Sequence, residues 1–310
     1  MTQAIGQTGG ETAADSQAAG VVVSGALSGG ASGGGGALWP AALTLWKREM
    51  VRFFRQKNRV VSALVTPVLL WVGLGAGLDR AFIQGGAETA GGLDAVTAAS
   101  GGGGGVGYMA YFFPGTLSMI LLFTAIFSTI SVIEDRREGF LQGVLVAPIP
   151  RLSIVLGKVL GGSSIAMIQA LVFMLLWPMV GSFPGFGAAL AAVCVLALLS
   201  VAMTAMGLCI AWPMDSTAAF HAVMMLFLMP MWFLCGAVFP VSTAMPWLRV
   251  LMWINPLTYG QSVLSRSLLG YDAVQTGLHL SLDILLMLLF TAGVLALAVR
   301  MVGKPRKDGV

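Results

Sequence analysis

Long apolar stretches recur along this chain, and few charged residues interrupt them. A helix of roughly 20 apolar residues is long enough to cross the hydrocarbon core of a bilayer, which is about 30 Å thick. A soluble helical protein can contain one such run in its core, but hardly six. The pattern therefore predicts an all-α, polytopic membrane protein. We place its six transmembrane helices at about 60–78, 108–133, 159–180, 188–210, 219–239 and 282–302.

The composition agrees with this pattern, since 57% of the 310 residues are hydrophobic and only 10% are charged. A soluble domain of this size needs more charge to cover its surface. The ionisable residues inside the predicted spans are His221, Asp283 and Arg300, and each lies close to an end of its span. We expect these side chains to reach the interface rather than remain in hydrocarbon.

The distribution of Lys and Arg predicts the orientation of the spans. Of the 17 Lys and Arg residues, Arg80, Arg249 and Arg266 lie on one side, and all others lie in the flanks that we place on the opposite side. Those flanks are the segment before the first span, the loop between the second and third spans, and the end of the chain. Because cytoplasmic flanks are rich in Lys and Arg, we expect both termini in the cytoplasm.

Glycine-rich and polar segments surround or interrupt the apolar region. Residues 1–36 are rich in Gly, Ala and Ser and lack the basic region that opens a secretory signal. We expect a disordered tail there, a transmembrane domain over 37–303 and a short cytoplasmic tail over 304–310. The first external loop contains a glycine run at 101–105 and is also expected to be mobile.

Residues 41–59, before the first span, place apolar and basic side chains at helical spacing. Trp46 and Phe53 are among the apolar positions, and Arg48 and Arg55 are among the basic ones. Such a helix suits the inner surface of the membrane, with its basic face toward anionic headgroups. The alternative is a solvated basic flank that only sets the topology.

The segment between the fifth and sixth spans is apolar, aromatic and interrupted by proline. It is too short and too broken for a full span, so we predict short re-entrant or interfacial helices near the outer headgroups. Backbone that is not helical at that depth must be covered by protein or line a cavity. The candidate residues of this external segment are Pro240, Pro246, Trp247, Asn255, Pro256, Tyr259 and Arg266.

The sequence shows no nucleotide site. A phosphate-binding loop needs Gly, four residues and then Gly-Lys-Ser/Thr. The nearest approach is Gly157-Lys158, which has Leu152 and Val159 at two of the required positions. The spans also carry no carboxylate at mid-depth, where ion-coupled transporters often place one. We therefore expect no catalytic, cofactor or metal site on this chain, no nucleic-acid partner, and an energy source on another chain.

The loop between the second and third spans combines charge with helical spacing. Glu134 and Glu138 are four residues apart, so a helical loop presents both on one face with Arg137 beside them. Pro148 and Pro150 are expected to end this helix. A short charged helix on a rigid span can dock into a groove of a partner and transmit its motion. The alternative is a solvated loop whose ion pairs contribute little.

Three motifs in this region carry a resemblance to a known family. They are Glu134-x-x-x-Glu138-Gly139, Ala147-Pro148-x-x-Arg151, and Leu156-Gly157-Lys158 leading into a span. Their order and placement resemble the ABC-2 family of transporter permeases, whose members include drug-resistance and lipo-oligosaccharide exporters. The six spans, the internal termini, the amphipathic helix and the external segment are also similar to that family, over residues 37–302. The Gly-rich first external loop departs from the family, which leaves its role open.

The resemblance implies an export permease in the bacterial plasma membrane that works with an ABC ATPase subunit. ATP and Mg would bind on that ATPase. The permease would form a homodimer or pair with a homologous permease, and it would contact membrane lipids through the interfacial helix. The external segment would gate the pathway from outside. The ATPase-coupling residues would be Glu134, Arg137, Glu138, Gly139, Pro148, Arg151 and Lys158.

Methionine and aromatic residues are frequent in the spans, and they indicate what kind of solute the chain could transport. They include Met203, Met206, Met224, Met225, Met229, Met231, Phe123, Phe127, Trp177, Trp232 and Phe233. Such side chains suit an adaptable apolar pathway for a lipophilic or amphipathic solute, although helix packing and lipid contact explain any single one of them as well. An ion-driven secondary transporter and a membrane anchor that moves no solute remain as alternatives.

Overall fold

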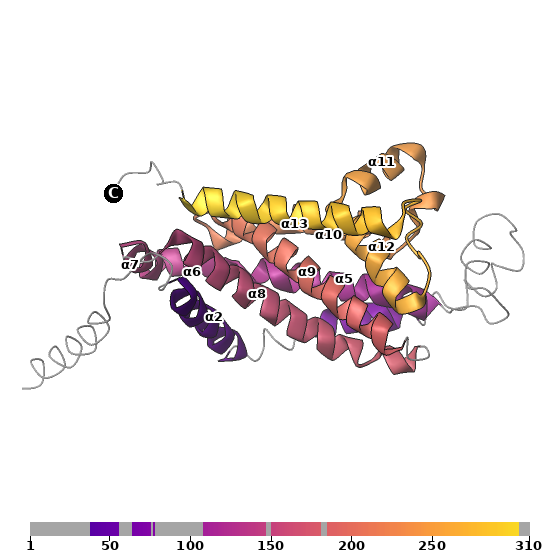
Figure 1. Cartoon of the computed structure of the whole chain (residues 1–310), viewed down its shortest axis with the longest axis horizontal. Coiled ribbons are helices and arrows are strands. Elements are labelled where there is room, and N and C mark those ends of the chain that lie inside the picture. Colours follow the sequence, from indigo (N-terminus) through magenta and orange to yellow (C-terminus); the bar gives the residue numbers. More distant parts are fainter. Residues whose placement is uncertain are drawn as a thin grey trace, which may run out of the picture. The chain divides into compact units, whose positions relative to one another are not determined.

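The computed structural model describes residues 38–55, 64–75, 77, 108–146, 150–180 and 185–303. The regular elements in these ranges are helices (Figure 1). In chain order they are α2 (Leu38–Arg55), the helix Leu64–Gly75, α5 (Tyr108–Ser128), α6 (Ile130–Arg137), α7 (Phe140–Val146), α8 (Arg151–Met174), η1 (Trp177–Met179), α9 (Phe186–Ala211), α10 (Thr217–Trp232), η2 (Phe233–Ala237), η3 (Val241–Thr243), α11 (Pro246–Ile254), α12 (Pro256–Leu269) and α13 (Leu280–Gly303). The expected tails at 1–36 and 304–310, the glycine run at 101–105 and Pro148 lie outside the described residues.

Several of these helices are long and apolar enough to cross a membrane. In the described ranges there are five: Tyr108–Arg137, Arg151–Met179, Phe186–Ala211, Thr217–Ala237 and Leu280–Gly303. The first predicted span corresponds to the shorter apolar helix Leu64–Gly75, and the ends of the 60–78 prediction lie outside the described residues. The prediction of an all-α, polytopic membrane protein is confirmed.

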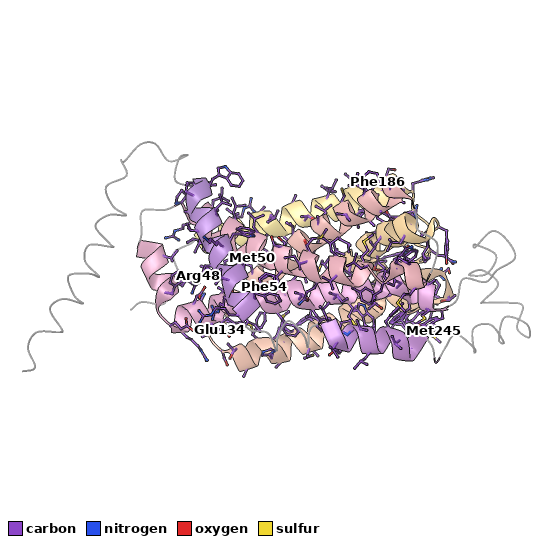
Figure 2. The ribbon with its side chains drawn as sticks, turned by 90° about the horizontal axis from the view of Figure 1, so that it is seen from below. Arg48, Met50, Phe54, Glu134, Phe186 and Met245 are labelled. Atoms are coloured by element: carbon purple, nitrogen blue, oxygen red, sulfur yellow. The ribbon has the colours of Figure 1, made fainter. Side chains whose placement is uncertain are left out.

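The spans run alongside one another, with shorter helices at their two ends (Figure 1). Helix α9 is central, because it packs against α5, α8, α12 and α13. Figure 2 shows Arg48 and Glu134 toward one end and Phe186 and Met245 toward the other. We call the first the inner end and the second the outer end, since the Lys and Arg pattern predicts that the first faces the cytoplasm.

The helices differ in how much of their apolar surface the chain itself covers. Helix α5 is buried on nearly all sides, and Phe112, Leu117 and Ile120 on it are inaccessible. Helix α10, in contrast, exposes Leu226 and Phe227. Lipid tails are as apolar as such side chains, so exposure of this kind is stable within a bilayer.

Two glycines on α8 allow α2 to lie directly against it. A Cβ atom at Gly157 would lie 2.6 Å from the Cβ atom of Leu45, and one at Gly161 would lie 2.8 Å from the Cβ atom of Glu49. Small residues four positions apart let two helices approach closely. The spacing Gly157-x-x-x-Gly161 is typical of a helix that packs closely against another helix.

Two helices at the inner end differ from what the sequence pattern suggests. The helix that contains the third predicted span already begins at Arg151, so Lys158 lies on this helix and not in a loop before it. Pro150 is the extended residue that precedes this helix. The helix α6 ends at Arg137, because Gly139 adopts a φ of +76° and turns the chain well before the prolines that were expected to end it.

Candidate functional site

The acidic face of α6 is turned toward α2. Oε2 of Glu134 lies 2.7 Å from Nη2 of Arg52, and Oε1 of Glu138 lies 3.8 Å from the same nitrogen. Glu134 and Glu138 thus share a face, as their spacing predicts. The side chain of Glu138 is 62% exposed, against 33% for Glu134, so Glu138 is the member of the pair that is more open to a partner.

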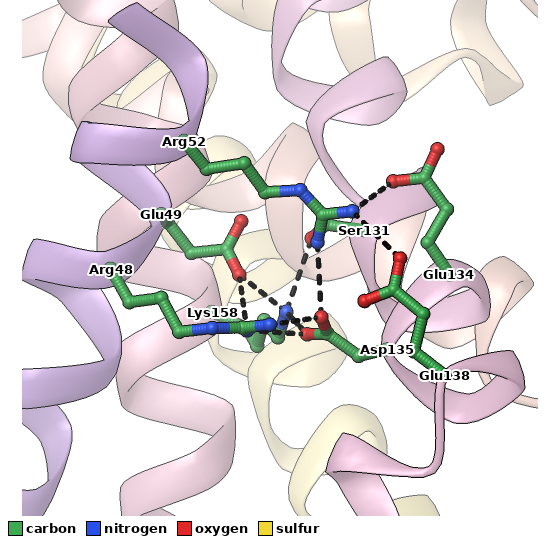
Figure 3. A network of polar contacts seen from close by, with 8 residues as sticks. All are labelled: Arg48, Glu49, Arg52, Ser131, Glu134, Asp135, Glu138 and Lys158. Atoms are coloured by element: carbon green, nitrogen blue, oxygen red, sulfur yellow. Dashed lines mark hydrogen bonds and ion pairs between the residues drawn. The ribbon is translucent and has the colours of Figure 1, made fainter. Parts of the chain in front are cut away.

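Behind this face lies a group of charged side chains from α2, α6 and α8 (Figure 3). At its centre is Asp135, whose side chain is completely buried. Arg48 donates to Asp135 through Nη1 at 2.9 Å and through Nη2 at 2.6 Å, and Arg52 donates to it through Nη1 at 3.0 Å. Lys158 donates through Nζ to both Asp135 and Glu49.

We call this group the inner ion cluster; its members are Arg48, Glu49, Arg52, Glu134, Asp135, Glu138 and Lys158. Burying an ion costs several kcal/mol unless well-placed partners compensate it. Asp135 has such partners, because three cations hydrogen-bond to its two oxygens. The hydrogen bond with Asp135 in turn raises the pKa of Arg48. The cluster therefore holds α2, α6 and α8 together through charges that depend on one another.

Two expectations for basic residues are wrong here. Arg48 lies on the predicted interfacial helix, but it faces Asp135 rather than lipid headgroups. Lys158 was expected in a cytoplasmic loop, yet it is buried on α8 between Glu49 and Asp135. Both errors have the same cause, because the sequence pattern assigns each flanking charge to water or headgroups. It does not show that three helices meet at one point.

Of the other candidate residues of α2, some contact the protein and others are exposed. Trp46 donates through Nε1 to Oγ of Ser164 on α8 at 3.0 Å. Phe53 is half-buried, whereas Phe54 and Arg55 are exposed. Helix α2 thus turns Arg48 and Trp46 toward the protein and Phe54 outward. Its contact with lipid remains a prediction.

Two more of the predicted coupling residues contact other segments at the inner end. Arg137 donates through Nε to the carbonyl of Asp215, between α9 and α10, at 3.0 Å. Arg151 donates through Nη1 to the carbonyls of Val302 and Gly303, both at 3.1 Å, where α13 ends. A cation is favourable there because the last carbonyls of a helix have no partner within the helix and carry its negative dipole end.

The external segment folds into two short helices whose starts follow from its sequence. Pro246 and Pro256 occupy first-turn positions of α11 and α12, where the missing N–H is not needed. Asn255 caps α12, because its Oδ1 accepts from the N–H of Leu257 at 3.1 Å. Its Nδ2 donates to the carbonyl of Met231 on α10 at 2.6 Å. Since α12 packs against α5, α9 and α13, it returns into the bundle as a re-entrant helix does.

The remaining aromatic and proline residues of this segment lie around α11. Pro240 is extended and precedes the turn η3. Trp247 on α11 is exposed. Tyr259 donates through its hydroxyl to the carbonyl of Trp253 at 2.5 Å, which ties α12 to α11. Exposed tryptophan at this end suits the membrane–water interface.

Arg266 forms a second polar cluster at the outer end. Its Nη2 lies 2.8 Å from Oδ2 of Asp272 and 3.3 Å from Oδ2 of Asp283. Oγ of Ser262 lies 3.1 Å from Asp272 and 2.8 Å from Asp283. Asp283 is fully buried, so the expectation that it reaches the interface is wrong. The reason is that α12 packs against α13 and covers this carboxylate.

A cavity of about 580 Å³ lies beside the inner ion cluster. It is lined in part by Phe123 and Phe127 of α5 and by Met225 and Met229 of α10. In contrast, Met203, Met224, Trp177 and Trp232 are buried in the helix core. Some of the Met and aromatic residues of the spans therefore line this cavity, and others pack in the core.

The two charged clusters join helices to one another. The inner ion cluster joins α2, α6 and α8, and the outer cluster joins α12 to the start of α13. In the part of the chain that the structure describes, no three His, Cys, Asp or Glu side chains lie where they could hold a metal ion together.

Known proteins resemble this chain in its membrane region. The family described as "ABC-2 type transporter" matches residues 40–269. "Putative transport permease ycf38" of Cyanophora paradoxa is 29% identical over 49% of this chain and 53% of its own length. "Probable multidrug ABC transporter permease YbhR" of Escherichia coli (strain K12) is 26% identical over 49% of this chain and 42% of its own length. "Nodulation protein J" of Sinorhizobium fredii is 25% identical over 79% of this chain and 85% of its own length. The chain thus spans about half the length of the first two relatives.

Proposed function

The chain belongs to the ABC-2 type transporter family, and from this membership we propose that it is the permease of an ATP-driven exporter. The family's members are membrane transport subunits of ABC systems, and they pair with ABC ATPase subunits. ATP and Mg would bind on that separate subunit. The matches to two named permeases cover about half of their length. We therefore propose the export activity from the family as a whole and not from these relatives.

The observation that carries the proposal is the way α6 is joined to the spans. Helix α6 follows α5 after a single turn, in which the N–H of Thr129 donates to the carbonyl of Ile126 at 3.0 Å. A displacement of α6 therefore moves α5 directly, and the inner ion cluster passes it to α2 and α8. ATP-driven closure of the partner ATPase would shift the spans between two states in this way. Coupling requires that ATP and solute favour these states unequally.

We assign ATPase coupling to residues 134–139, with Glu138 as the side chain that contacts the ATPase. Its exposed position and the turn at Gly139 support this role. Arg137, Arg151 and Lys158 would hold the segment in place through their contacts with neighbouring helices. The external segment would gate the pathway at the outer end.

The remaining parts of the proposal concern solute, assembly and location. The cavity beside α5 and α10 supports a lipophilic or amphipathic solute. The exposed apolar side chains of α10 suit pairing with a second permease, either the same chain or a homologue. The Lys and Arg pattern supports an orientation with both termini in the cytoplasm, and the family resemblance suggests the bacterial plasma membrane.

Affinity purification from gently solubilised native membranes tests the two-subunit pump. We expect a soluble chain with a phosphate-binding loop to be recovered in stoichiometric amount, and we expect ATP hydrolysis by the complex but not by the permease alone. Recovery without an ATPase, while control complexes stay intact, would favour the ion-driven alternative. Transport that collapses with the ion gradient while ATP remains would do the same.

Glu138→Ala should reduce ATP-driven transport by about tenfold while the amount of protein in the membrane stays close to wild type. The side chain is mostly exposed and its pairing with Arg52 is long, at 3.8 Å, so its removal costs less than about 1 kcal/mol of stability. Transport into inverted vesicles, normalised to permease content, measures the effect. The matched control is Asp215→Ala, which also removes an exposed carboxylate at the inner end. Equal transport by both variants and wild type would exclude the coupling role of Glu138.

A further inference from the structure

The cavity beside the inner ion cluster has the dimensions of a small-molecule site. Its volume of about 580 Å³ falls within the range of roughly 300–1,000 Å³ that is typical for drug-sized ligands. It is lined by residues of α2, the helix Leu64–Gly75, α5, α6, α8 and α10, and extends from Glu134 and Thr217 at the inner end to Met119 and Met229. A bound molecule would have one end near charged side chains and its body among apolar ones.

The body of the cavity is lined by aromatic rings and methionine. The rings of Phe123 and Phe127, one turn apart on α5, have centroids 5.9 Å apart. The ring of His221 on α10 lies 5.4 Å from that of Phe127. Ring faces attract cations, and they do so more strongly when water is excluded. Methionine side chains such as Met225 adapt to ligands of different shape.

The charged rim favours one sign of ligand charge. Among the described lining residues, Glu49 and Glu134 are acidic and Arg52 is basic. Arg52 already donates to Glu134 and Asp135, and Lys158 behind it already donates to Glu49 and Asp135. An anionic ligand would have to break one of these ion pairs to gain a partner. A cation could instead lie beside Glu134 without breaking the pair that Glu134 forms with Arg52.

We propose that this cavity binds lipophilic monovalent cations, which are molecules with an apolar body and a single positive charge. The body would lie against Phe123 and Met225, and the charge would lie between Glu134 and the ring of Phe127. This inference rests on the proposed function, because it names the class of solute. It concerns binding, however, which can be measured on the permease without the ATPase.

Two ions of the same shape and opposite charge, tetraphenylphosphonium and tetraphenylborate, test the sign preference. Each would be dialysed separately to equilibrium against the purified chain in nanodiscs of zwitterionic lipid, with protein-free nanodiscs as the blank. We expect saturable binding of tetraphenylphosphonium above the blank and none of tetraphenylborate. Binding of tetraphenylborate at equal or higher affinity, or no excess binding of tetraphenylphosphonium, would overturn the proposal.

A matched pair of variants locates the site. Phe127→Leu and Phe227→Leu each remove one ring, but Phe227 is exposed on α10 and does not line the cavity. We expect the Kd for tetraphenylphosphonium to rise about tenfold in Phe127→Leu, within the range expected for a lost cation–π contact. The Kd should not change in Phe227→Leu or in Phe127→Tyr, which keeps the ring. An unchanged Kd in monodisperse Phe127→Leu protein would overturn the proposal.

The results also separate this inference from the proposed function. Recovery of an ATPase together with absent cation binding would remove the cation site and leave the pump. Saturable cation binding that is lost in Phe127→Leu would support the site even where no ATPase is recovered, and in that case the exporter is the hypothesis that fails.

Discussion

Replacing Asp135 with alanine should destabilise the chain by about 3–5 kcal/mol, which is the usual effect of breaking a buried ion pair from one side. Asp135 is completely buried and accepts hydrogen bonds from Arg48, Arg52 and Lys158. Without it, Arg48 keeps Glu49 at 3.8 Å and the ring of Phe140 at 3.7 Å, and Lys158 loses one of two carboxylates. The shift in the unfolding midpoint, measured by titration with SDS in mixed micelles, checks this prediction.

An exposed ion pair at the same end of the molecule provides the control. Asp215 lies 3.1 Å from Arg136, and its side chain is 67% exposed. Asp215→Ala should cost less than about 1 kcal/mol, since water and salt screen such pairs. Asp135→Asn keeps the shape of the side chain and removes its charge, so it should resemble Asp135→Ala. If Asp135→Ala were as stable as Asp215→Ala, the inner ion cluster would not hold the three helices together.

The features that could be predicted from the sequence are those that depend on local pattern. Runs of apolar residues predict the long helices, because a bilayer imposes the same requirement on each span separately. Pro246, Asn255 and Pro256 start the external helices, and each acts on backbone groups within a few residues. The shared face of Glu134 and Glu138 is local in the same sense, since it needs only helical spacing.

The features that could not be predicted depend on which helices become neighbours. Lys158 is buried against α2, which is distant in the sequence, and Asp283 is covered by the preceding helix α12. The local pattern of neither residue distinguishes it from one that reaches the interface. Glu49 looks like a solvated acid in a basic flank, yet it is buried against α8. A trace of this arrangement exists in the sequence, because Gly157 and Gly161 leave room for Leu45 and Glu49 on successive turns of α2. Identifying the partner helix of those glycines required the structure.

Replacing Gly236 with alanine should cost more stability than the same change at Gly270, although the two backbones are alike. Their φ angles are +83° and +81°, so alanine is penalised by about 1–2 kcal/mol at either position. A Cβ atom at Gly270 would meet nothing within 4 Å, whereas one at Gly236 would lie 2.5 Å from Cγ1 of Val274. Val274 is buried, so overpacking adds roughly 1–3 kcal/mol at Gly236 alone. Unfolding midpoints of the two variants in detergent measure the difference.

The position of Gly236 connects this cost to the external segment. Gly236 lies in the π-helical turn η2 that ends α10, and its carbonyl accepts from the hydroxyl of Tyr111 on α5 at 3.2 Å. The segment that contains Val274 is fixed nearby, because the N–H of Val241 donates to the carbonyl of Val274 at 2.8 Å. Alanine at Gly236 would push this segment away from the end of α10. The external helices should then pack less tightly on the bundle.

The buried thiol of Cys235, next to Gly236, can report this loosening. The other two cysteines, Cys194 and Cys209, would be replaced by alanine so that a maleimide labels one site. We expect faster labelling of Cys235 in Gly236→Ala than in Gly270→Ala, because only the first substitution displaces the cover over η2. Equal labelling rates with equal unfolding midpoints would show that Val274 moves aside at little cost. The external segment would then be held by the Asn255 and Arg266 contacts rather than by the close approach at Gly236.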